Sequence, residues 1–267
     1  MAETALAKST DDMILIEHLP FETDGGIAER AAIGLIVLAT DYTIEHEWRT
    51  IFNQVDGIAL YHARILNENE ISPESLRAME PRITQTTELL TPDTPVDVVA
   101  YGCTSASMAI GEEKVFKNIR KAQPNAKCTT PITGAFAAFK AFSAKRIGVL
   151  TPYPADVNHI VARYMIERGV DVPVFGSFNE KLDTNVSRIS QQSIEKGIRE
   201  IMQHADVDAI FVSCTSVRLI EYCQELEANL GLPLTSSNHV MAWHTLRLAG
   251  IEENYPQFGS LFELPLN

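Results

Sequence analysis

The chain has 267 residues, of which 45% are hydrophobic, and its formal net charge is −13. This length and apolar content suffice for a substantial core in one large or two ordinary domains. The acidic balance, with no cluster of Lys and Arg, disfavours nucleic acid and membrane surfaces as partners. No apolar run approaches the roughly 20 residues that span a bilayer, and the first residues lack the features of a signal peptide, so we expect a cytoplasmic protein.

In chain order, the sequence alternates between apolar, β-rich runs and segments with helical apolar spacing, and it does so twice. The predicted elements are a strand at 33–38, a helix at 45–55, a strand at 97–102, a helix after Pro131, a strand at 147–150, a helix at 193–204, a strand at 208–213 and a helix after Pro233. This alternation predicts an α/β fold with parallel sheets covered by helices.

Two strands of this series end in the same tripeptide. The first segment, "DVVAYGCTS", contains Cys103, and the second, "DAIFVSCTS", contains Cys214. Gly34 precedes Cys103 by 69 residues and Gly148 precedes Cys214 by 66, so the two halves correspond in length. We therefore predict two similar subdomains, 31–142 and 143–250, with an N-terminal arm at 1–30 and a C-terminal tail at 251–267.

The repeated motif has the composition of a binding site for a small anion. A strand that runs into Cys-Thr-Ser and then a helix places the sulfur at the carboxyl end of the strand, where open α/β sheets bind ligands. Backbone N–H groups and the hydroxyls of Thr104, Ser105, Thr215 and Ser216 can donate to a carboxylate. A helix N-terminus also favours the thiolate form. Two opposed thiols can remove a proton from one face of a substrate and return one to the other.

The remaining cysteines and the absence of cofactor motifs limit the chemistry further. Cys128 and Cys223 occupy unmatched positions, so we expect them to be packing residues. Four widely spaced cysteines do not form a disulfide framework, and no Cys/His pattern resembles a metal site. No glycine-rich phosphate-binding motif is present. The expected site therefore uses no metal and no cofactor.

Longer segments carry a family resemblance. "IGLIVLATDYTIEHE", "IGVLTPYPADVN" and "LPLTSSNHVMAWHTLRLAG" resemble the aspartate/glutamate racemase superfamily, in the branch of maleate cis-trans isomerase, arylmalonate decarboxylase and ectoine-utilisation protein A. The resemblance implies two Rossmann-like halves related by a pseudo-twofold axis, an active site in the cleft between them, catalysis without a cofactor and, in many members, a homodimer.

The resemblance also implies roles for single residues. Cys103 and Cys214 match the two catalytic cysteines of the racemases and maleate isomerases, whereas arylmalonate decarboxylases keep only the second. In an isomerase Cys103 would be the nucleophile and Cys214 the acid/base partner; in a racemase each would be the base in one direction. Tyr153 and Asn185 match residues that bind a substrate carboxylate, although a turn tyrosine and a helix-capping asparagine explain them equally well.

Asp41 departs from the maleate isomerase pattern, which has an asparagine after the first strand. An ionised carboxylate only accepts hydrogen bonds, and it repels a second carboxylate. Asp41 therefore favours a substrate with an ammonium or amidinium group, as in an amino acid or an ectoine-derived compound. The alternative is that Asp41 caps the helix that starts near Ile44.

These inferences predict a cofactor-independent isomerase, either a racemase or epimerase or a cis-trans isomerase, of a small carboxylate or amino-acid-derived substrate. A role in ectoine degradation agrees with this prediction. The alternatives are a non-catalytic binding protein for an anionic metabolite and an arylmalonate-type decarboxylase.

Overall fold

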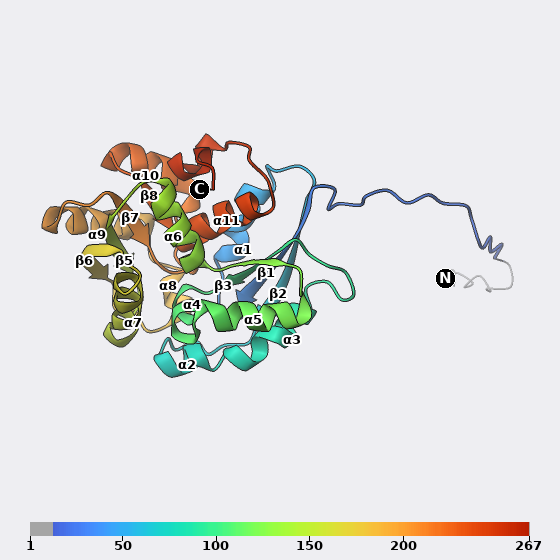
Figure 1. Ribbon diagram of the computed structural model, residues 1–267, viewed down its shortest axis with the longest axis horizontal. Helices are drawn as coiled ribbons and strands as arrows, with labels where there is room; N and C mark the ends of the chain where they lie inside the picture. The colour runs from blue at the N-terminus through green and yellow to red at the C-terminus, as the bar shows by residue number, and fades with distance from the viewer. Residues whose placement is uncertain (1–12, 267) are drawn as a thin grey trace, which may run out of the picture.

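The computed structural model describes residues 13–266, and its strands form two parallel sheets of four strands each (Figure 1). The first sheet has the order β2-β1-β3-β4 and the second the order β6-β5-β7-β8. The strands are β1 (Ala31–Leu38), β2 (Ile58–Ile65), β3 (Val98–Gly102), β4 (Lys127–Thr129), β5 (Arg146–Thr151), β6 (Asp171–Ser177), β7 (Ala209–Val212) and β8 (Leu234–Ser236). The identical order in the two sheets confirms the predicted α/β class and the internal repeat.

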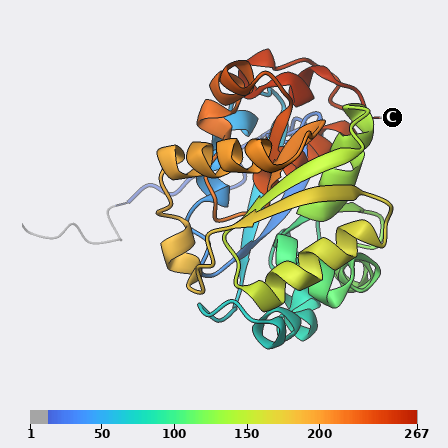
Figure 2. The same ribbon diagram turned by 90° about the vertical axis from the view of Figure 1, so that its left-hand side faces the viewer.

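Helices cover both faces of each sheet, as the nearly continuous burial of β1, β3 and β7 requires. In the second half, α9 and α7 lie on opposite sides of β5 and β6 (Figure 2). The α-helices are α1 (Ile44–Phe52), α2 (Pro73–Arg77), α3 (Ile83–Glu88), α4 (Thr104–Ile110), α5 (Glu112–Ala122), α6 (Pro131–Ala141), α7 (Ala155–Ile166), α8 (Asp183–Val186), α9 (Gln191–His204), α10 (Cys223–Leu230) and α11 (Ser237–Leu248). The predicted helices at 45–55 and 193–204 correspond to α1 and α9.

The two halves are joined by α6 and α11, which each follow the last strand of one sheet and pack against the other half. Phe139 of α6 makes an edge-to-face contact with Phe211 of β7, with 5.7 Å between ring centroids. Conversely, α11 packs against β3 and β4, and α6 and α11 also pack against each other. The interface between the halves is therefore a continuous part of the core.

Gly134 lies where α6 meets α11, and it permits a close approach of the two backbones. A methyl group at this position would lie 2.7 Å from the backbone oxygen of Val240 and 2.9 Å from its carbonyl carbon. Overpacking of this kind costs about 1–3 kcal/mol. Replacing Gly by Ala in a helix gains about 0.8–1.0 kcal/mol in helix propensity, so the cost exceeds the gain over most of its range.

We therefore expect Gly134→Ala to lower the free energy of unfolding, measured by urea titration. Gly25→Ala is the control, because a methyl group there meets nothing within 4 Å. A Gly134→Ala variant more stable than the natural chain would contradict the close approach.

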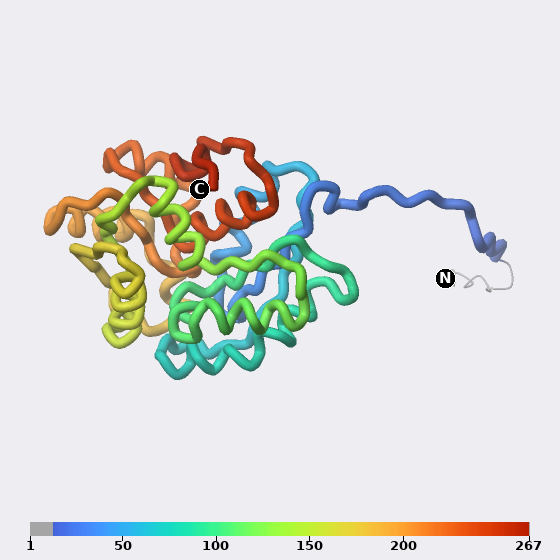
Figure 3. Tube along the Cα trace, in the orientation of Figure 1, coloured from blue at the N-terminus to red at the C-terminus, as the bar shows by residue number. Residues whose placement is uncertain are grey.

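The chain ends differ in how they relate to the body of the molecule. Residues 13–30 contain no helix or strand and lead away from the body as an arm, whereas the C-terminus lies against it (Figure 3). The first part of the predicted arm, residues 1–12, lies outside the described residues. The predicted tail contains two short 3-10 helices, Pro256–Phe258 and Ser260–Glu263, and its Phe258, Leu261 and Phe262 side chains are buried.

Candidate active site

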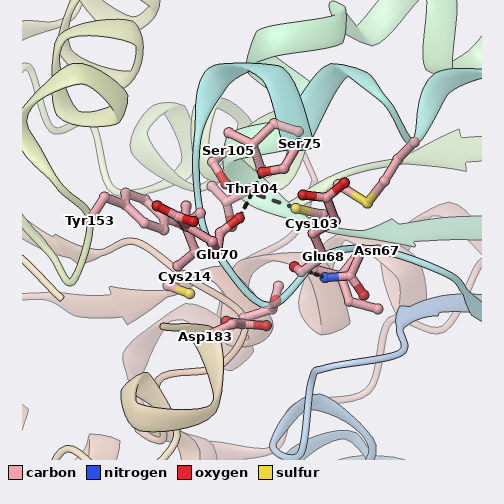
Figure 4. A pocket seen from close by; sticks show the side chains of 15 residues that line it. Asn67, Glu68, Glu70, Ser75, Cys103, Thr104, Ser105, Tyr153, Asp183 and Cys214 are labelled. Atoms are coloured by element: carbon pink, nitrogen blue, oxygen red, sulfur yellow. Dashed lines mark hydrogen bonds between the residues drawn. The ribbon is translucent and has the colours of Figure 1, made fainter. Parts of the chain in front are cut away.

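Both Cys-Thr-Ser motifs lie at the carboxyl ends of equivalent strands. Cys103 follows β3, whose last residue pairs with Val37 of β1, and Cys214 lies two residues beyond the end of β7, which pairs with β5. One cysteine comes from each half, and both line the same pocket (Figure 4). The tertiary structure thus brings together two positions that are 111 residues apart in the sequence.

The pocket combines the two thiols with carboxylates, hydroxyls and a small apolar patch. Its lining residues are Leu38, Asn67, Glu68, Glu70, Ile71, Ser75, Leu76, Met79, Cys103, Thr104, Ser105, Tyr153, Asp183, Cys214 and Thr215. Six of these were predicted from the sequence: Cys103, Thr104, Ser105, Tyr153, Cys214 and Thr215. The structure corrects the placement of the other three predicted contacts, Asp41, Asn185 and Ser216, which do not line the pocket.

Cys103 is the N-cap residue of α4. Its sulfur accepts a hydrogen bond from Ala106 N at 3.4 Å and lies 3.9 Å from Ser105 Oγ. Burial nevertheless raises the pKa of the Cys103 thiol to about 12, and this outweighs the lowering by the two neighbouring donors. Burial of Cys103, which is only 4% exposed, therefore opposes the thiolate that the helix N-terminus was expected to favour.

Cys214 differs from Cys103 in its local structure. A turn, rather than the expected helix, follows it, and the next helical residues are the 3-10 helix Ile220–Tyr222. Its φ of 152° is unusual for a residue with a side chain. Its N–H donates to Ser237 Oγ at 2.9 Å. Burial is the main cause that raises the pKa of the Cys214 thiol well above its usual range, and the nearby charge of Asp183 raises it further. The hydroxyl of Tyr153 lowers it.

The four hydroxyls predicted as substrate donors are used unequally within the protein. Thr104 Oγ1 donates to Ser237 Oγ at 2.7 Å, Ser216 Oγ donates to Asp183 Oδ1 at 2.7 Å, and Thr215 Oγ1 is 3.4 Å from the oxygen of Gly102. Among the described residues, Ser105 Oγ has only the long contact with the Cys103 sulfur. Ser105 is therefore the hydroxyl of this group that is most available to a ligand.

Ser237, the first residue of α11, was not predicted from the sequence. Its hydroxyl oxygen accepts from both motifs, from Thr104 Oγ1 and from the backbone N–H of Cys214. A Ser or Thr at the start of a helix is ordinarily a capping residue, so nothing in the sequence distinguished this one. In the structure it holds the two cysteine turns in a fixed relation.

The residue of α8 that lines the pocket is Asp183, and not the expected Asn185. Asn185 is exposed, whereas Asp183 is only 4% exposed and faces both cysteines. Oδ1 of Asp183 accepts from Ser216 Oγ, and Oδ2 accepts from Thr40 Oγ1 at 2.5 Å. Burial raises the pKa of this carboxyl group, and the two donors oppose that rise.

Asp41 is fully buried and binds backbone N–H groups at the start of a helix. Its Oδ1 accepts from the backbone N–H groups of Thr43 and Ile44 at 2.7 and 2.9 Å, where α1 begins. This is the capping alternative considered for Asp41. Its Oδ2 is buried and has no hydrogen-bond partner among the described residues. Burial raises the pKa of Asp41 to about 6, although the two backbone donors lower it.

A loop and a short segment from opposite halves close over the pocket. The backbone oxygen of Asn69 accepts a hydrogen bond from Asp183 N at 3.1 Å, and the side-chain oxygen of Asn69 accepts one from Thr184 N at 3.2 Å. Ile71 N donates to Lys181 O at 2.9 Å, beside an antiparallel bridge between residues 70 and 182. These hydrogen bonds join the two halves directly beside the pocket.

Metal-binding clusters and membrane-spanning helices are both absent from the described part of the chain. Within residues 13–266, no group of three or more His, Cys, Asp and Glu side chains is arranged to hold a metal ion. In the same part of the chain, no helix has the length and apolarity needed to cross a membrane.

Comparison with known proteins identifies the family of this fold and site. The family model for arylmalonate decarboxylase matches residues 33–262. The chain belongs to this family. A maleate isomerase of Pseudomonas putida is 26% identical over 86% of this chain and 96% of its own length, and an arylmalonate decarboxylase of Bordetella bronchiseptica is 27% identical over 51% and 58%. The predicted resemblance to this branch is confirmed.

Solved structures of the same branch share the fold. Nocardia farcinica maleate cis-trans isomerase has a TM-score of 0.80 at 21% identity, covering 87% of this chain and 97% of that one. A structure of arylmalonate decarboxylase has a TM-score of 0.71 at 21% identity, covering 87% and 99%. A mutant of the Nocardia enzyme carries a covalently bound succinylcysteine intermediate. These structures show that the fold of this chain is that of the same branch.

Proposed function

We propose that this chain is a cofactor-independent isomerase of a small carboxylate or amino-acid-derived substrate, with Cys103 and Cys214 as its catalytic residues. The observation that carries the proposal is that both motif cysteines line one pocket at the carboxyl ends of β3 and β7. A single buried cysteine is ordinary packing, but two at matched strand ends in one closed pocket supply a reactive group from each half of the protein.

In a cis-trans isomerisation, the Cys103 thiolate adds to one carbon of the substrate double bond, and a proton is delivered to the other carbon. Rotation about the resulting single bond, followed by loss of that proton and of the thiolate, gives the isomer. Cys214 transfers the proton. In a racemisation, one cysteine removes the α-proton and the other returns one to the opposite face. Tyr153 and Ser105 have hydroxyls placed to bind the substrate carboxylate in either reaction.

The deprotonated sulfur must form inside a pocket that disfavours it. Burial raises the pKa of both thiols. Substrate binding therefore has to supply the compensating interactions, from the Ser105 and Tyr153 hydroxyls and from the ligand itself. The closed pocket then strengthens these interactions by excluding water.

The proposal extends to the setting of the enzyme. Two subdomains, 31–142 and 143–250, each contribute one cysteine, while the arm at 1–30 and the tail at 251–267 flank them. We include a cytoplasmic location, which rests on the sequence features described above, and a homodimer and an ectoine-derived substrate, which rest on the resemblance. A decarboxylase is the second candidate, because the matching family model carries that description; the cysteine at position 103 argues against it.

Proton NMR in deuterated water tests the reaction class. The panel contains maleate, aspartate, glutamate, hydroxyaspartate and ectoine-derived acids. Deuterium uptake at a stereocentre identifies proton transfer between two bases, and conversion of maleate to fumarate identifies addition to a double bond. Loss of carbon dioxide from an arylmalonate favours the second candidate. Binding of panel compounds without any conversion would favour a non-catalytic binding protein and overturn the proposal.

A further inference from the structure

The charged side chains that line the pocket are all carboxylates. Glu68 and Glu70 lie on the loop that contains Asn69, and Asp183 lines the pocket together with the two cysteines (Figure 4). No Lys, Arg or His is among the lining residues of the described chain. A ligand whose only charges are carboxylates therefore meets like charges inside the pocket without a cationic side chain to offset them.

Asp183 is held in a fixed position from both halves. Thr40 of the first half and Ser216 of the second half each donate to one of its oxygens, and its backbone N–H donates to Asn69 O. Each carboxylate oxygen has two lone pairs, so each retains one acceptor site after these contacts. Asp183 is thus a buried, oriented acceptor in the same pocket as both sulfurs.

Arg64 of β2 is occupied by other partners. Arg64 donates to the backbone oxygens of Leu38, Ala39 and Asp41 and forms an ion pair with Glu45 at 2.6 Å. Asp183 itself forms no ion pair within residues 13–266. The carboxylate that faces the thiols therefore has hydroxyl and backbone partners but no charged partner.

We infer that the substrate carries an ammonium or amidinium group in addition to its carboxylate, and that Asp183 binds that cationic group and determines specificity for it. This inference rests on the proposed function, because it assigns the substrate class of the same pocket. The substrate carboxylate then lies toward the hydroxyls of Ser105 and Tyr153. Dicarboxylates without a cationic group are poor ligands.

The same pairing has a consequence for the cysteines. Burial is the main cause that raises the pKa of both Cys103 and Cys214, and the negative charge of Asp183 raises it further. A cation bound at Asp183 offsets that charge, so the thiolate forms more readily when the correct substrate is in place. Recognition of the cation and activation of the sulfur are then one event.

The test is binding of three four-carbon acids, measured by isothermal titration calorimetry at pH 7. Succinate, aspartate and 2,4-diaminobutanoate carry net charges of two minus, one minus and one plus. The natural chain should bind 2,4-diaminobutanoate at least about tenfold more tightly than succinate, with aspartate between them. Equal or tighter binding of succinate, or no binding of 2,4-diaminobutanoate at millimolar concentration, overturns the inference without any variant.

Variants assign the preference to one residue. Asp183→Asn should reduce the preference for the cationic acid to about twofold or less, whereas Asp183→Glu, which keeps the charge, should retain most of it. Asp206→Asn makes the same change of net charge at an exposed site away from the pocket and should leave the preference intact. An Asp183→Asn protein that is folded, by circular dichroism, and keeps the natural preference overturns the role of Asp183.

Failure of this inference and failure of the proposed function give different results. If a dicarboxylate is both bound and isomerised, the isomerase proposal stands and the cation requirement is wrong. If the cationic acids bind with the expected order but no panel compound exchanges a proton or isomerises, the substrate class stands and the isomerase proposal is wrong.

Discussion

Cys103→Ser and Cys214→Ser should each lower turnover by about 10²–10⁴-fold, the range attributed to one positioned acid or base. A serine hydroxyl is a far weaker acid than a thiol, so neither variant can form the required anion near neutral pH. The fold should survive, because the contacts of the sulfurs are long: each accepts from a backbone N–H at 3.4 Å, and Cys103 also contacts Ser105 Oγ at 3.9 Å. Turnover is measured by the NMR assay on the substrate that the panel identifies.

The control for these variants is Cys128→Ser. Cys128 is also buried, but it lies in β4 away from the pocket, with its thiol donating to Ala126 O. We expect its turnover to remain within about twofold of the natural chain, as for a change outside the catalytic machinery. Full activity in either pocket variant would contradict the assignment of two catalytic cysteines.

Mass spectrometry of the Cys214→Ser variant then separates the two reaction types. In a cis-trans isomerisation, Cys103 still adds to the double bond, and without its proton-transfer partner the adduct accumulates as a mass increase equal to that of the substrate. In a racemisation no bond forms to sulfur, so the mass of the variant remains unchanged.

Glu47→Ala should destabilise the protein by several kcal/mol, because it removes the acceptor at the centre of a buried network between the halves. Glu47 lies on α1 and is 1% exposed. Its Oε1 accepts from the backbone N–H groups of Leu219 and Ile220 at 2.5 and 2.7 Å, and its Oε2 accepts from Asn238 Nδ2 at 2.6 Å. Each buried donor left without a partner costs about 1–3 kcal/mol.

Glu47→Gln is the matched variant, since its side-chain oxygen can still accept from both backbone donors and only the acceptor for Asn238 Nδ2 is lost. We expect it to lose less stability than Glu47→Ala in urea unfolding followed by circular dichroism. Equal losses in the two variants would contradict the importance of the two backbone hydrogen bonds at this position.

The ionisation of the same network sets a pH dependence. Burial raises the pKa of Glu47 from 4.5 to about 7 and that of Asp41 from 3.8 to about 6. In this interval the folded chain binds more protons than the unfolded chain, so the stability contributed by these groups is greatest below about pH 4 and declines as the pH rises toward about 7. Urea unfolding between these pH values should show that the free energy of unfolding declines less steeply in Glu47→Gln than in the natural chain. A steeper decline in the variant would contradict the raised pKa of Glu47.

The strands β1, β3, β5 and β7 and the cysteine pair were predictable because their signals are local, whereas β2, β4, β6 and β8 were not predicted. A buried parallel strand needs a continuous apolar run, and β1 and β7 supply one in a few residues. Two such runs ending in Cys-Thr-Ser at matched distances indicate one reactive group in each half, whatever the details of packing. The class of the fold and the identity of the two sulfurs therefore followed from short segments read separately.

The contacts around the sulfurs were not predictable, because they join distant segments. Glu47 and Asn238 are 191 residues apart, and Ser237 binds both cysteine turns only because α11 crosses to the other half. In the same way, the choice of Asp183 over Asn185 depends on which side of one helical turn faces the pocket. Residues two apart on a helix point to different sides, and the sequence contains no record of where the neighbouring half lies.

The sequence by itself determined the α/β repeat and the two strand ends at which the proposed catalytic cysteines lie. Only the tertiary structure decided that burial outweighs the helix terminus at Cys103, that a turn and not a helix begins directly after Cys214, and that carboxylates without a cationic side chain line the pocket. The physical reason is that hydrophobic periodicity acts over a few residues, whereas desolvation and charge act through space, between groups whose proximity arises only when the halves pack together.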